Sequence, residues 1–197
     1  MILGVGQLLE LVKTKKLVEN LSERELTNPE GAGFDLRLGE IYKLKSKMNK
    51  FLARENKNQK SKRPQSFLGV SERQTPDVEL VAKYDSKKKT SFVFKPGSYY
   101  LIKTIEKVNT PNNILILFRP RSTLFRSGMM LLTATCSPGY CGELTFGIAN
   151  LGPCDVKIEM GARAAHAMFF QVKGKTNLYR GQWQGGRVTA RKRERQV

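Results

Sequence analysis

Hydrophobic positions near the N-terminus recur with the period of a helix. Val5, Leu8, Leu9 and Val12 stand at positions i, i+3, i+4 and i+7, which places them on one face of a helix. We therefore expect a short amphipathic helix over residues 6–16. Most of the chain that follows has a β pattern, so this helix is expected to pack on the outside of a β core.

The pattern then changes to the period of a strand. Phe34, Leu36 and Leu38 alternate with Asp35 and Arg37, which predicts a half-exposed strand after the turn signals around residues 28–31. Charges placed in this way on a strand are more often structural ion pairs than catalytic groups. We therefore expect Asp35 and Arg37 to form an ion pair.

From residue 91 onward the β pattern is continuous. Short apolar runs separated by turns with Gly, Pro and Asn predict strands at residues 100–105, 114–118, 144–148, 156–158 and 164–170. Such regular spacing predicts an all-β sandwich or barrel of the jelly-roll kind. At 197 residues, the chain is expected to form one domain over residues 1–172.

Two segments differ from this pattern. Residues 44–90 are rich in lysine and poor in apolar residues, so we expect a basic insertion of long, mobile hairpins or loops. Residues 173–197 are rich in Gly and Arg and are expected to form a flexible C-terminal tail. That tail contains Tyr179 and Trp183, which a purely solvated segment would not need.

The charge balance favours an anionic partner. The 35 Lys and Arg residues against 17 Asp and Glu residues give a formal net charge of +18, which suits a nucleotide, a nucleic acid or an anionic surface. The same charge is equally well explained by solvated lysines in the insertion and the tail. Because Phe51 and Phe67 lie among basic residues, binding of single-stranded nucleic acid through the insertion is an alternative.

The sequence has no targeting or membrane signal. No apolar run approaches the ~18 residues of a membrane span, and the N-terminus lacks a basic-then-apolar pattern. A cytoplasmic protein without membrane association is therefore expected. Cys136, Cys141 and Cys154 are an odd number without metal-ligand spacing. We expect reduced thiols, a Cys136–Cys141 disulfide being the minor alternative, and we predict no metal site made by protein ligands.

A candidate phosphate site lies in RSTLFRSG, residues 121–128. Arg121 and Arg126 carry permanently charged guanidinium groups that fit phosphate oxygens. Ser122, Thr123 and nearby backbone N–H groups can donate further hydrogen bonds. A single Arg at the end of a strand would more often form a surface ion pair.

The chain resembles the dUTPase and dCTP deaminase superfamily. The resemblance spans about residues 30–188 apart from the insertion, and six segments carry it in the family's order: GFDLRLG, PGSYYLIKTIEKVNTPNN, RSTLFRSG, SPGYCGELTF, EMGARAAHAMFF and YRGQWQGG. It implies a distorted jelly-roll β-barrel that assembles as a trimer or hexamer. Active sites between subunits would be closed by the C-terminal tail. The implied substrate is a deoxypyrimidine nucleoside triphosphate, with Mg²⁺ bound through its phosphates.

The resemblance also implies binding roles. RSTLFRSG is similar to the family's phosphate-binding motif, which favours phosphate binding over a surface ion pair for its two arginines. Tyr140 stands where the family stacks a ring on the deoxyribose, which leaves no room for a ribose hydroxyl. Tyr179 and Gln182 match tail positions that contact base or phosphate, and Arg180 is a candidate clamp for the triphosphate.

The catalytic positions depart from the family's pattern. Ser137 stands where the hydrolases carry the Asp that deprotonates water, and a hydroxyl with a pKa far above neutral is a poor base. Gly147 stands where the deaminases carry a proton-shuttling Glu. The remaining candidates are Glu143, whose simplest role is structural, and Asp35. We expect one of these carboxylates to reach the attacking water.

Three functions remain open, in this order: a dUTP diphosphatase, a dCTP deaminase, and a catalytically lapsed relative that binds nucleotide, protein or nucleic acid. The first is preferred because RSTLFRSG followed by SPGYCG looks closest to archaeal-type dUTPases and because Gly147 counts against deamination. His166 is the only histidine. The sequence therefore lacks the His/Cys ligand set of a zinc-dependent deaminase and offers no arrangement for a Ser-His-Asp site. His166 lies in an apolar strand and is expected to be a packed core residue.

Overall fold

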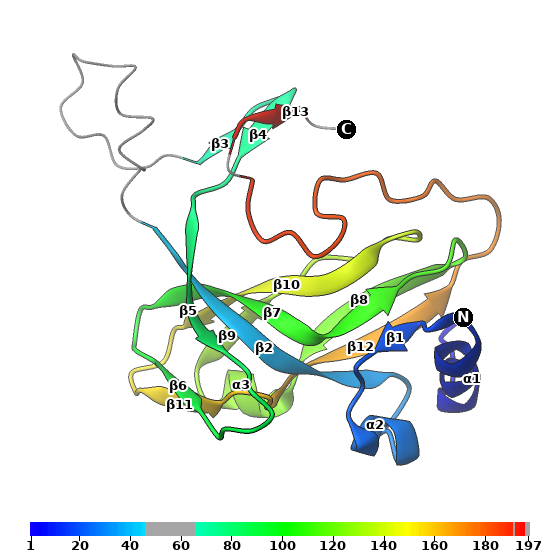
Figure 1. Ribbon diagram of the computed structural model, residues 1–197, viewed down its shortest axis with the longest axis horizontal. Coiled ribbons are helices and arrows are strands. Elements are labelled where there is room, and N and C mark those ends of the chain that lie inside the picture. The colour runs from blue at the N-terminus through cyan, green and yellow to red at the C-terminus, as the bar shows by residue number, and fades with distance from the viewer. Residues whose placement is uncertain (46–65, 191, 196–197) are drawn as a thin grey trace.

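The computed structural model describes residues 1–45, 66–190 and 192–195 (Figure 1). Its elements are α1 (Val5–Lys15), β1 (Val18–Glu19), α2 (Glu23–Thr27), β2 (Phe34–Leu44), β3 (Phe67–Leu68), β4 (Glu72–Gln74), β5 (Val78–Lys83), β6 (Ser91–Phe94), β7 (Tyr99–Asn109), β8 (Ile114–Pro120), α3 (Ser122–Arg126), β9 (Met129–Leu132), β10 (Cys141–Asn150), β11 (Val156–Glu159), β12 (Arg163–Gln171) and β13 (Glu194–Arg195).

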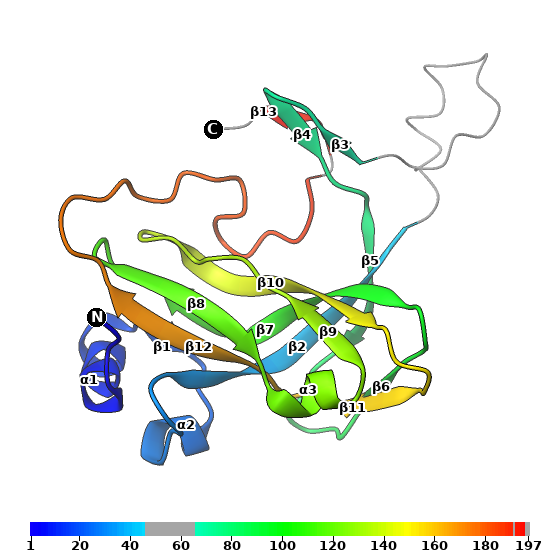
Figure 2. The ribbon, with the colours of Figure 1, turned by 180° about the vertical axis from the view of Figure 1, so that it is seen from behind.

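One antiparallel sheet forms the body of the protein. Its strands follow the order β8-β12-β2-β7-β10-β9, with β1 added to β7 and β5 added to β2. After β9, Cys136 bridges Ile116 of β8, so the two edges of the path approach each other and the sheet curls into a nearly closed barrel (Figures 1 and 2). The prediction of an all-β, jelly-roll-like barrel is confirmed.

The core fills the barrel because apolar residues alternate along its strands. In β7 every second residue from Ile102 to Val108 is buried, and this buried face includes the polar Thr104 and Glu106 beside Ile102 and Val108. The rings of Phe34 and Phe169 meet edge to face with centroids 5.8 Å apart. Fully burying an aromatic or aliphatic side chain of this size contributes about 1.5–3 kcal/mol.

The N-terminal helix has the predicted position. Leu8 is fully buried, and Leu9 and Val12 pack against the core from the same face. Lys16 ends the helix in the left-handed conformation with φ 52°, and its N–H donates to the carbonyl of Val12. The amphipathic pattern was therefore a sufficient signal for this element.

The start of β2 differs from the prediction of a half-exposed strand. Asp35 is 1% exposed and Arg37 is only partly exposed. The expected Asp35–Arg37 ion pair is also wrong. Arg37 instead donates from Nε to Oε1 of the buried Glu106 over 2.6 Å, whereas Asp35 faces cationic groups from β12, from α2 and from the residue before α3.

The basic insertion lies partly outside the described residues, and so does Phe51. Its described part contains paired strands, among them the antiparallel pair of β3 and β4, which agrees with the expected hairpins. β5 pairs with β2 from Glu40 opposite Lys83 to Leu44 opposite Val78, with a register shift between Ile41 and Tyr42. β3 and β4 form a small sheet that β13 from the C-terminus completes.

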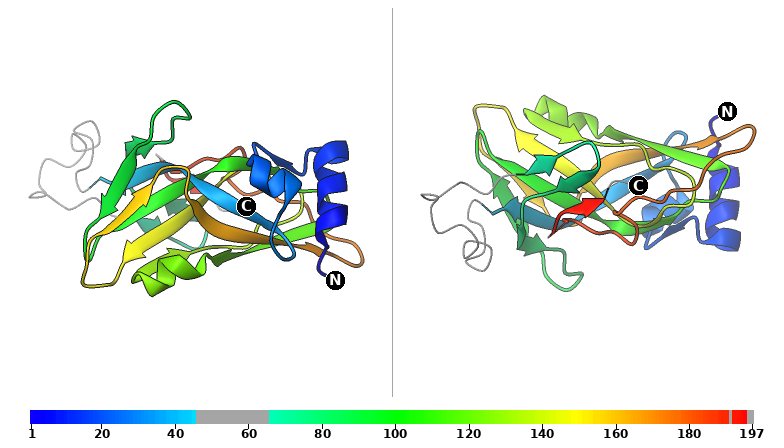
Figure 3. Two further views of the ribbon diagram at one scale, coloured as in Figure 1. Left: turned by 90° about the horizontal axis from the view of Figure 1, so that it is seen from below. Right: turned by 90° about the horizontal axis from the view of Figure 1, so that it is seen from above.

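The C-terminal segment, residues 173–195, crosses above the barrel, on the side opposite α1, α2 and α3 (Figures 1 and 3). It joins the small sheet through β13, where Glu194 lies opposite Arg73. The hydroxyl of Thr189 donates to the carbonyl of Pro76 over 2.8 Å, and the N–H of Ala190 donates to Thr75 Oγ1 over 2.8 Å. These contacts hold the segment against its own chain.

The three cysteines are free thiols. Cys136 is buried, and this burial raises the pKa of its thiol to about 11, so it is protonated and unreactive at neutral pH. Within the described residues, no helix is long and apolar enough to cross a membrane.

Candidate functional site

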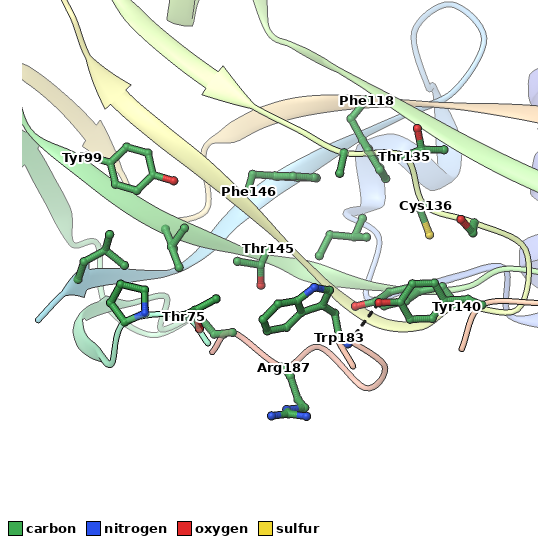
Figure 4. Close-up of a pocket in the computed structure, with 18 residues that line it drawn as sticks. Thr75, Tyr99, Phe118, Thr135, Cys136, Tyr140, Thr145, Phe146, Trp183 and Arg187 are labelled. Carbon is green, nitrogen blue, oxygen red and sulfur yellow. Dashed lines mark hydrogen bonds between the residues drawn. The ribbon is translucent and has the colours of Figure 1, made fainter. Parts of the chain in front are cut away.

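A cavity of about 540 Å³ lies between the barrel and the C-terminal segment (Figure 4). Its wall is mostly apolar and aromatic, and the barrel supplies most of it. The lining includes Tyr99, Phe118, Ser137, Tyr140, Thr145 and Phe146 from the barrel and Tyr179 and Trp183 from the tail. Cavities of this size and character accommodate small organic ligands.

The C-terminal tail packs over the turn that contains Ser137 and Tyr140. The N–H of Tyr179 donates to the carbonyl of Pro138 over 2.7 Å, and the N–H of Gly185 donates to the carbonyl of Cys141 over 2.8 Å. Between them, the amide of Gln184 accepts from the N–H of Cys141 and donates to the carbonyl of Gly139. The tail is therefore matched to this turn by directional hydrogen bonds.

Gly142 allows this close approach. Its φ is +144°, and a Cβ there would lie 2.4 Å from the backbone nitrogen of Gly186 in the tail. Any side chain at this position would push the tail away from the barrel, in addition to straining the backbone. Gly185 and Gly186, the last two residues of YRGQWQGG, form the other side of this contact.

Tyr140 is held rigidly at one end of the cavity. It is buried, its hydroxyl donates to the carbonyl of Glu143 over 2.7 Å, and its ring meets that of Tyr179 edge to face with centroids 5.3 Å apart. Burial is the main cause that raises its pKa above the ordinary value. The hydroxyl is therefore neutral at any physiological pH, and Tyr140 offers a fixed aromatic surface.

The space above Gly147 is occupied by Tyr99. A Cβ built on Gly147 would lie 2.5 Å from the Tyr99 hydroxyl and 3.3 Å from Cβ of Leu132. An acidic side chain at Gly147 could enter the cavity only if the Tyr99 ring moved. The Tyr99 ring thus fills the space that a side chain at position 147 would need.

Glu143 points away from the cavity. It is absent from the lining, its side chain is 35% exposed, and its carboxylate pairs with Nζ of Lys103 over 3.4 Å. The following residue, Leu144, lines the cavity instead, at the point where the pairing of β10 with β7 shifts register between Glu143 and Thr145.

Asp35 is enclosed by cationic and hydrogen-bonding groups. Its carboxylate lies 2.9 Å from Nη1 of Arg121, 2.9 Å from Nη1 of Arg163 and 2.9 Å from Nδ1 of His166, and its N–H donates to Glu25. Burial by itself would raise the pKa of Asp35. The hydrogen bond with His166 and the charges of Arg121 and Arg163 outweigh that effect and hold the pKa below its ordinary value.

This arrangement corrects the expectation for His166. The ring is not simply packed in the core, because its side chain is 20% exposed and Nδ1 is hydrogen-bonded to Asp35. His166 lies opposite Asp35 in the pairing of β12 with β2, so sheet register alone brings the two together.

The RSTLFRSG motif lies at the opposite side of the barrel from the tail (Figures 1 and 2). Arg121 precedes α3, and Ser122, Thr123 and Arg126 are exposed on it. The structure therefore brings Ser137, Tyr140 and Tyr179 together in one chain. It does not bring the predicted phosphate-binding residues to them.

Two further tail residues have distinct environments. Arg180 is exposed. Both amide atoms of Gln182 are buried without a hydrogen-bond partner among the described residues. An unpaired buried amide costs about 1–3 kcal/mol per group, so the pattern at Gln182 is one that a bound ligand or water would relieve.

Sequence reasoning missed several lining residues, above all Tyr99, Thr145 and Arg187. Tyr99 lies on β7 and Gly147 on β10, and these two strands are paired. The spacing of residues in a single sequence does not show that pairing. Trp183 had a weak signal, since an aromatic residue in a polar tail suggests that the tail packs on something.

The described residues contain no group of three or more His, Cys, Asp or Glu side chains arranged to hold a metal ion. The cavity lining includes no Asp or Glu among them either. A divalent cation in this cavity would therefore need oxygen ligands from a bound molecule, since carboxylates and similar oxygens are what Mg²⁺ prefers.

The fold and the cavity define a barrel protein of the all-β class, with a largely apolar ligand cavity closed by its own C-terminal segment. Residues 2–172 match the family described as dCTP deaminase-like. The chain belongs to this family.

Its relatives carry two different names. The chain is 28% identical over 170 residues to a probable deoxyuridine 5'-triphosphate nucleotidohydrolase of Methanothermobacter thermautotrophicus. The matched region covers 86% of this chain and 94% of that protein. The chain is 30% identical over 107 residues to a dCTP deaminase of Thermococcus kodakarensis, which covers 54% of this chain and 69% of that protein.

Among solved structures, the 2'-deoxycytidine 5'-triphosphate deaminase from Agrobacterium tumefaciens matches with a TM-score of 0.56 and 16% identity, over 85% of this chain and 47% of that one. This likeness concerns the fold. The chain spans about half the length of that deaminase.

Proposed function

We propose that the protein binds a deoxypyrimidine nucleoside triphosphate in the cavity and hydrolyses dUTP to dUMP and diphosphate. The observation that carries this choice is the contact between Tyr99 and Gly147, since the space that the resemblance would give to the deaminase Glu holds a phenol instead. Hydrolysis does not need a group at that position. The relative matched over nearly its whole length, named a probable nucleotidohydrolase, supports the same choice.

The binding proposal rests on Tyr140. A deoxyribose stacked on this ring would be enclosed by the barrel below and by Tyr179 of the tail beside it. Because Tyr140 is fixed by its hydrogen bond to the Glu143 carbonyl, it could not retreat to admit a ribose 2'-hydroxyl. The base would lie against the apolar wall around Phe146.

We further propose that Arg121, Ser122, Thr123 and Arg126 bind the phosphates of a nucleotide held by a second copy of the chain. Their place on the far side of the barrel from Tyr140 supports a site shared between copies, as in a homotrimer or hexamer. Exposed apolar side chains beside α3 support association there: Phe125 is 56%, Met130 46% and Leu151 69% exposed. Arg180 and Gln182 would complete the site from the tail.

Two variants test the shared site by complementation. We expect Arg126→Ala and Tyr140→Leu each to weaken binding of the non-hydrolysable analogue α,β-imido-dUTP, because each variant lacks one half of every site. In a co-expressed mixture that assembles at random into closed rings, about one site in four combines an intact Arg126 with an intact Tyr140. High-affinity binding should therefore return in about a quarter of the sites. If the mixture binds no better than either variant alone, the shared site is wrong.

Mg²⁺ fits this proposal as an ion held by the triphosphate. With no carboxylate in the described cavity lining, the phosphate oxygens would supply its ligands. When bound, the ion would neutralise charge on the phosphates, and the arginines of the motif would neutralise the rest.

The described cavity lining offers no carboxylate as a general base. Ser137 lines the cavity with a hydroxyl, which is a poor base at neutral pH. Glu143 is held by Lys103 outside the cavity, and Asp35 is engaged by its cationic neighbours. We therefore expect slow turnover. The lack of a carboxylate in the described lining specifically favours a second candidate function, nucleotide binding without turnover.

One experiment separates these functions. The full chain is incubated with dUTP and with dCTP in the presence of Mg²⁺, and release of diphosphate and ammonia is followed. Diphosphate from dUTP without ammonia supports the diphosphatase. Ammonia from dCTP would mean that a different group replaces the missing Glu. Binding of the analogue without either product identifies the lapsed relative.

A further inference from the structure

We infer that the hydroxyl of Tyr99 recognises the base of the bound nucleotide by donating a hydrogen bond to a ring carbonyl oxygen, and so makes the cavity prefer uracil to cytosine. This inference rests on the proposed function, because it concerns the ligand of the same cavity. It assigns a specificity-determining role to Tyr99, a residue of the PGSYYLIKTIEKVNTPNN segment that carried no predicted role.

The position of Tyr99 supports this role. β7 alternates, so Tyr99 and Leu101 line the cavity while Tyr100, between them, packs edge to face on Phe92 and Phe94 in another cluster. The Tyr99 hydroxyl makes no hydrogen bond to any residue that the structure describes. Figure 4 shows it pointing to the side of the cavity where Thr145 and Phe146 lie.

The Tyr99 side chain is 40% exposed, but the part of the cavity wall that it shares is apolar. Leu101, Phe118 and Phe146 line the same cavity, so few neighbouring groups could satisfy a ligand's polar atoms. In such a setting one well-placed donor fixes how a base is oriented. Burial also raises the pKa of Tyr99, so the phenol carries its proton, and can donate it to a hydrogen bond, throughout the neutral range.

A second hydroxyl lies nearby on the same wall. Oγ1 of Thr145, two residues before Gly147, is buried without a partner among the described residues, a condition that costs free energy unless a ligand relieves it. In Figure 4 the Thr145 hydroxyl faces the indole of Trp183. A ligand that reaches Thr145 would therefore shift that indole.

The donor character of Tyr99 decides the direction of the preference. Uracil presents a carbonyl oxygen at the position where cytosine presents an amino group. A carboxylate above Gly147 would accept from the amino group, whereas a protonated phenol is best paired with the carbonyl. The exchange of an acceptor for a donor thus reverses which base is favoured.

The test measures binding of α,β-imido-dUTP and α,β-imido-dCTP to the full chain. Tyr99→Phe removes only the hydroxyl, and we expect it to weaken the uracil analogue about three- to tenfold, the usual value of a neutral hydrogen bond, while the cytosine analogue is unchanged. Tyr100→Phe is the matched control, because it removes the same group one residue away and outside the cavity. We expect it to change neither affinity.

Gly147→Ala provides an independent check. Its Cβ would displace the Tyr99 hydroxyl, so it should weaken the uracil analogue in the wild-type background and have little further effect in Tyr99→Phe. Equal affinities of wild-type protein and Tyr99→Phe for the uracil analogue would overturn this inference alone. If wild-type protein binds neither analogue, the proposed function fails, and this inference fails with it.

Discussion

Ser137→Asp raises the rate of dUTP hydrolysis by about 100-fold or more, because a positioned general base contributes on the order of 10²–10⁴. Ser137 lines the cavity next to the turn that holds Tyr140, and it stands where the hydrolases that the chain resembles carry their Asp. A carboxylate there would face the cavity, unlike Glu143. The measurement is steady-state release of diphosphate at saturating dUTP and Mg²⁺.

The matched control is Ser137→Asn, which has nearly the same shape as Asp but cannot accept a proton. We expect it to leave turnover at or below the wild-type rate. If the Asp and Asn variants turn over dUTP equally, the missing carboxylate at position 137 is not what limits hydrolysis in this cavity. The proposed position of the attacking water would then be wrong.

Asp35→Asn lowers the free energy of unfolding by about 3 kcal/mol, because it leaves Arg121 and Arg163 without the buried carboxylate between them. Both guanidinium groups keep some access to water, with side chains 27% and 38% exposed, so the loss should lie toward the lower end of the range for broken buried pairs. Denaturant titration measures it. Asp155→Asn is the control, since its pair with Lys95 is solvent-exposed and should contribute little.

The same variant distinguishes a structural Asp35 from a catalytic one. A general base replaced by its amide would leave stability nearly unchanged and remove turnover. We expect Asp35→Asn to lower the free energy of unfolding. We also expect it to weaken phosphate binding, because the guanidinium group of Arg121 is no longer held in place. Unchanged stability together with lost turnover would restore Asp35 as the base.

The stabilisation by Asp35 should depend on pH in a defined direction. Its pKa is lowered in the folded protein, so its contribution is fully present above the unfolded pKa of about 3.9 and is lost as the pH falls through the folded pKa. The difference in stability between wild-type protein and Asp35→Asn should therefore be constant near neutral pH and shrink below about pH 4. A difference that grows on acidification would contradict the ion-pair account.

Local patterns were enough to predict most of the fold. The period of Leu8, Leu9 and Val12 predicted α1. The apolar runs predicted β7, β8, β10 and β12 of the barrel and β11 of the separate two-stranded sheet, although β7 continues to Asn109 and not only to residue 105. α3 was missed because RSTLFRSG has no helical period over so few residues. β5 was missed because a strand that pairs along one edge of β2 needs no continuous apolar face.

The site was predictable only as far as the family resemblance reached. The resemblance gave Tyr140 and Tyr179 binding roles, and the turn and the tail that hold these residues meet in the structure. The Tyr99–Gly147 contact depends on the register of β7 against β10. The surroundings of Asp35 come from β2, β12 and the residue before α3, so no spacing rule applied to a single sequence could have assembled them.

The most direct test of nucleotide binding in the cavity uses its tryptophan. Trp183 is the only tryptophan in the chain, and it lines the cavity, so its fluorescence reports on the site without a label. Titration of the full chain with α,β-imido-dUTP should give a saturable change in this fluorescence, and the ribose analogue α,β-imido-UTP should bind far more weakly because Tyr140 excludes the 2'-hydroxyl. No saturable change with the deoxy analogue, or equal affinity for both sugars, would contradict the account.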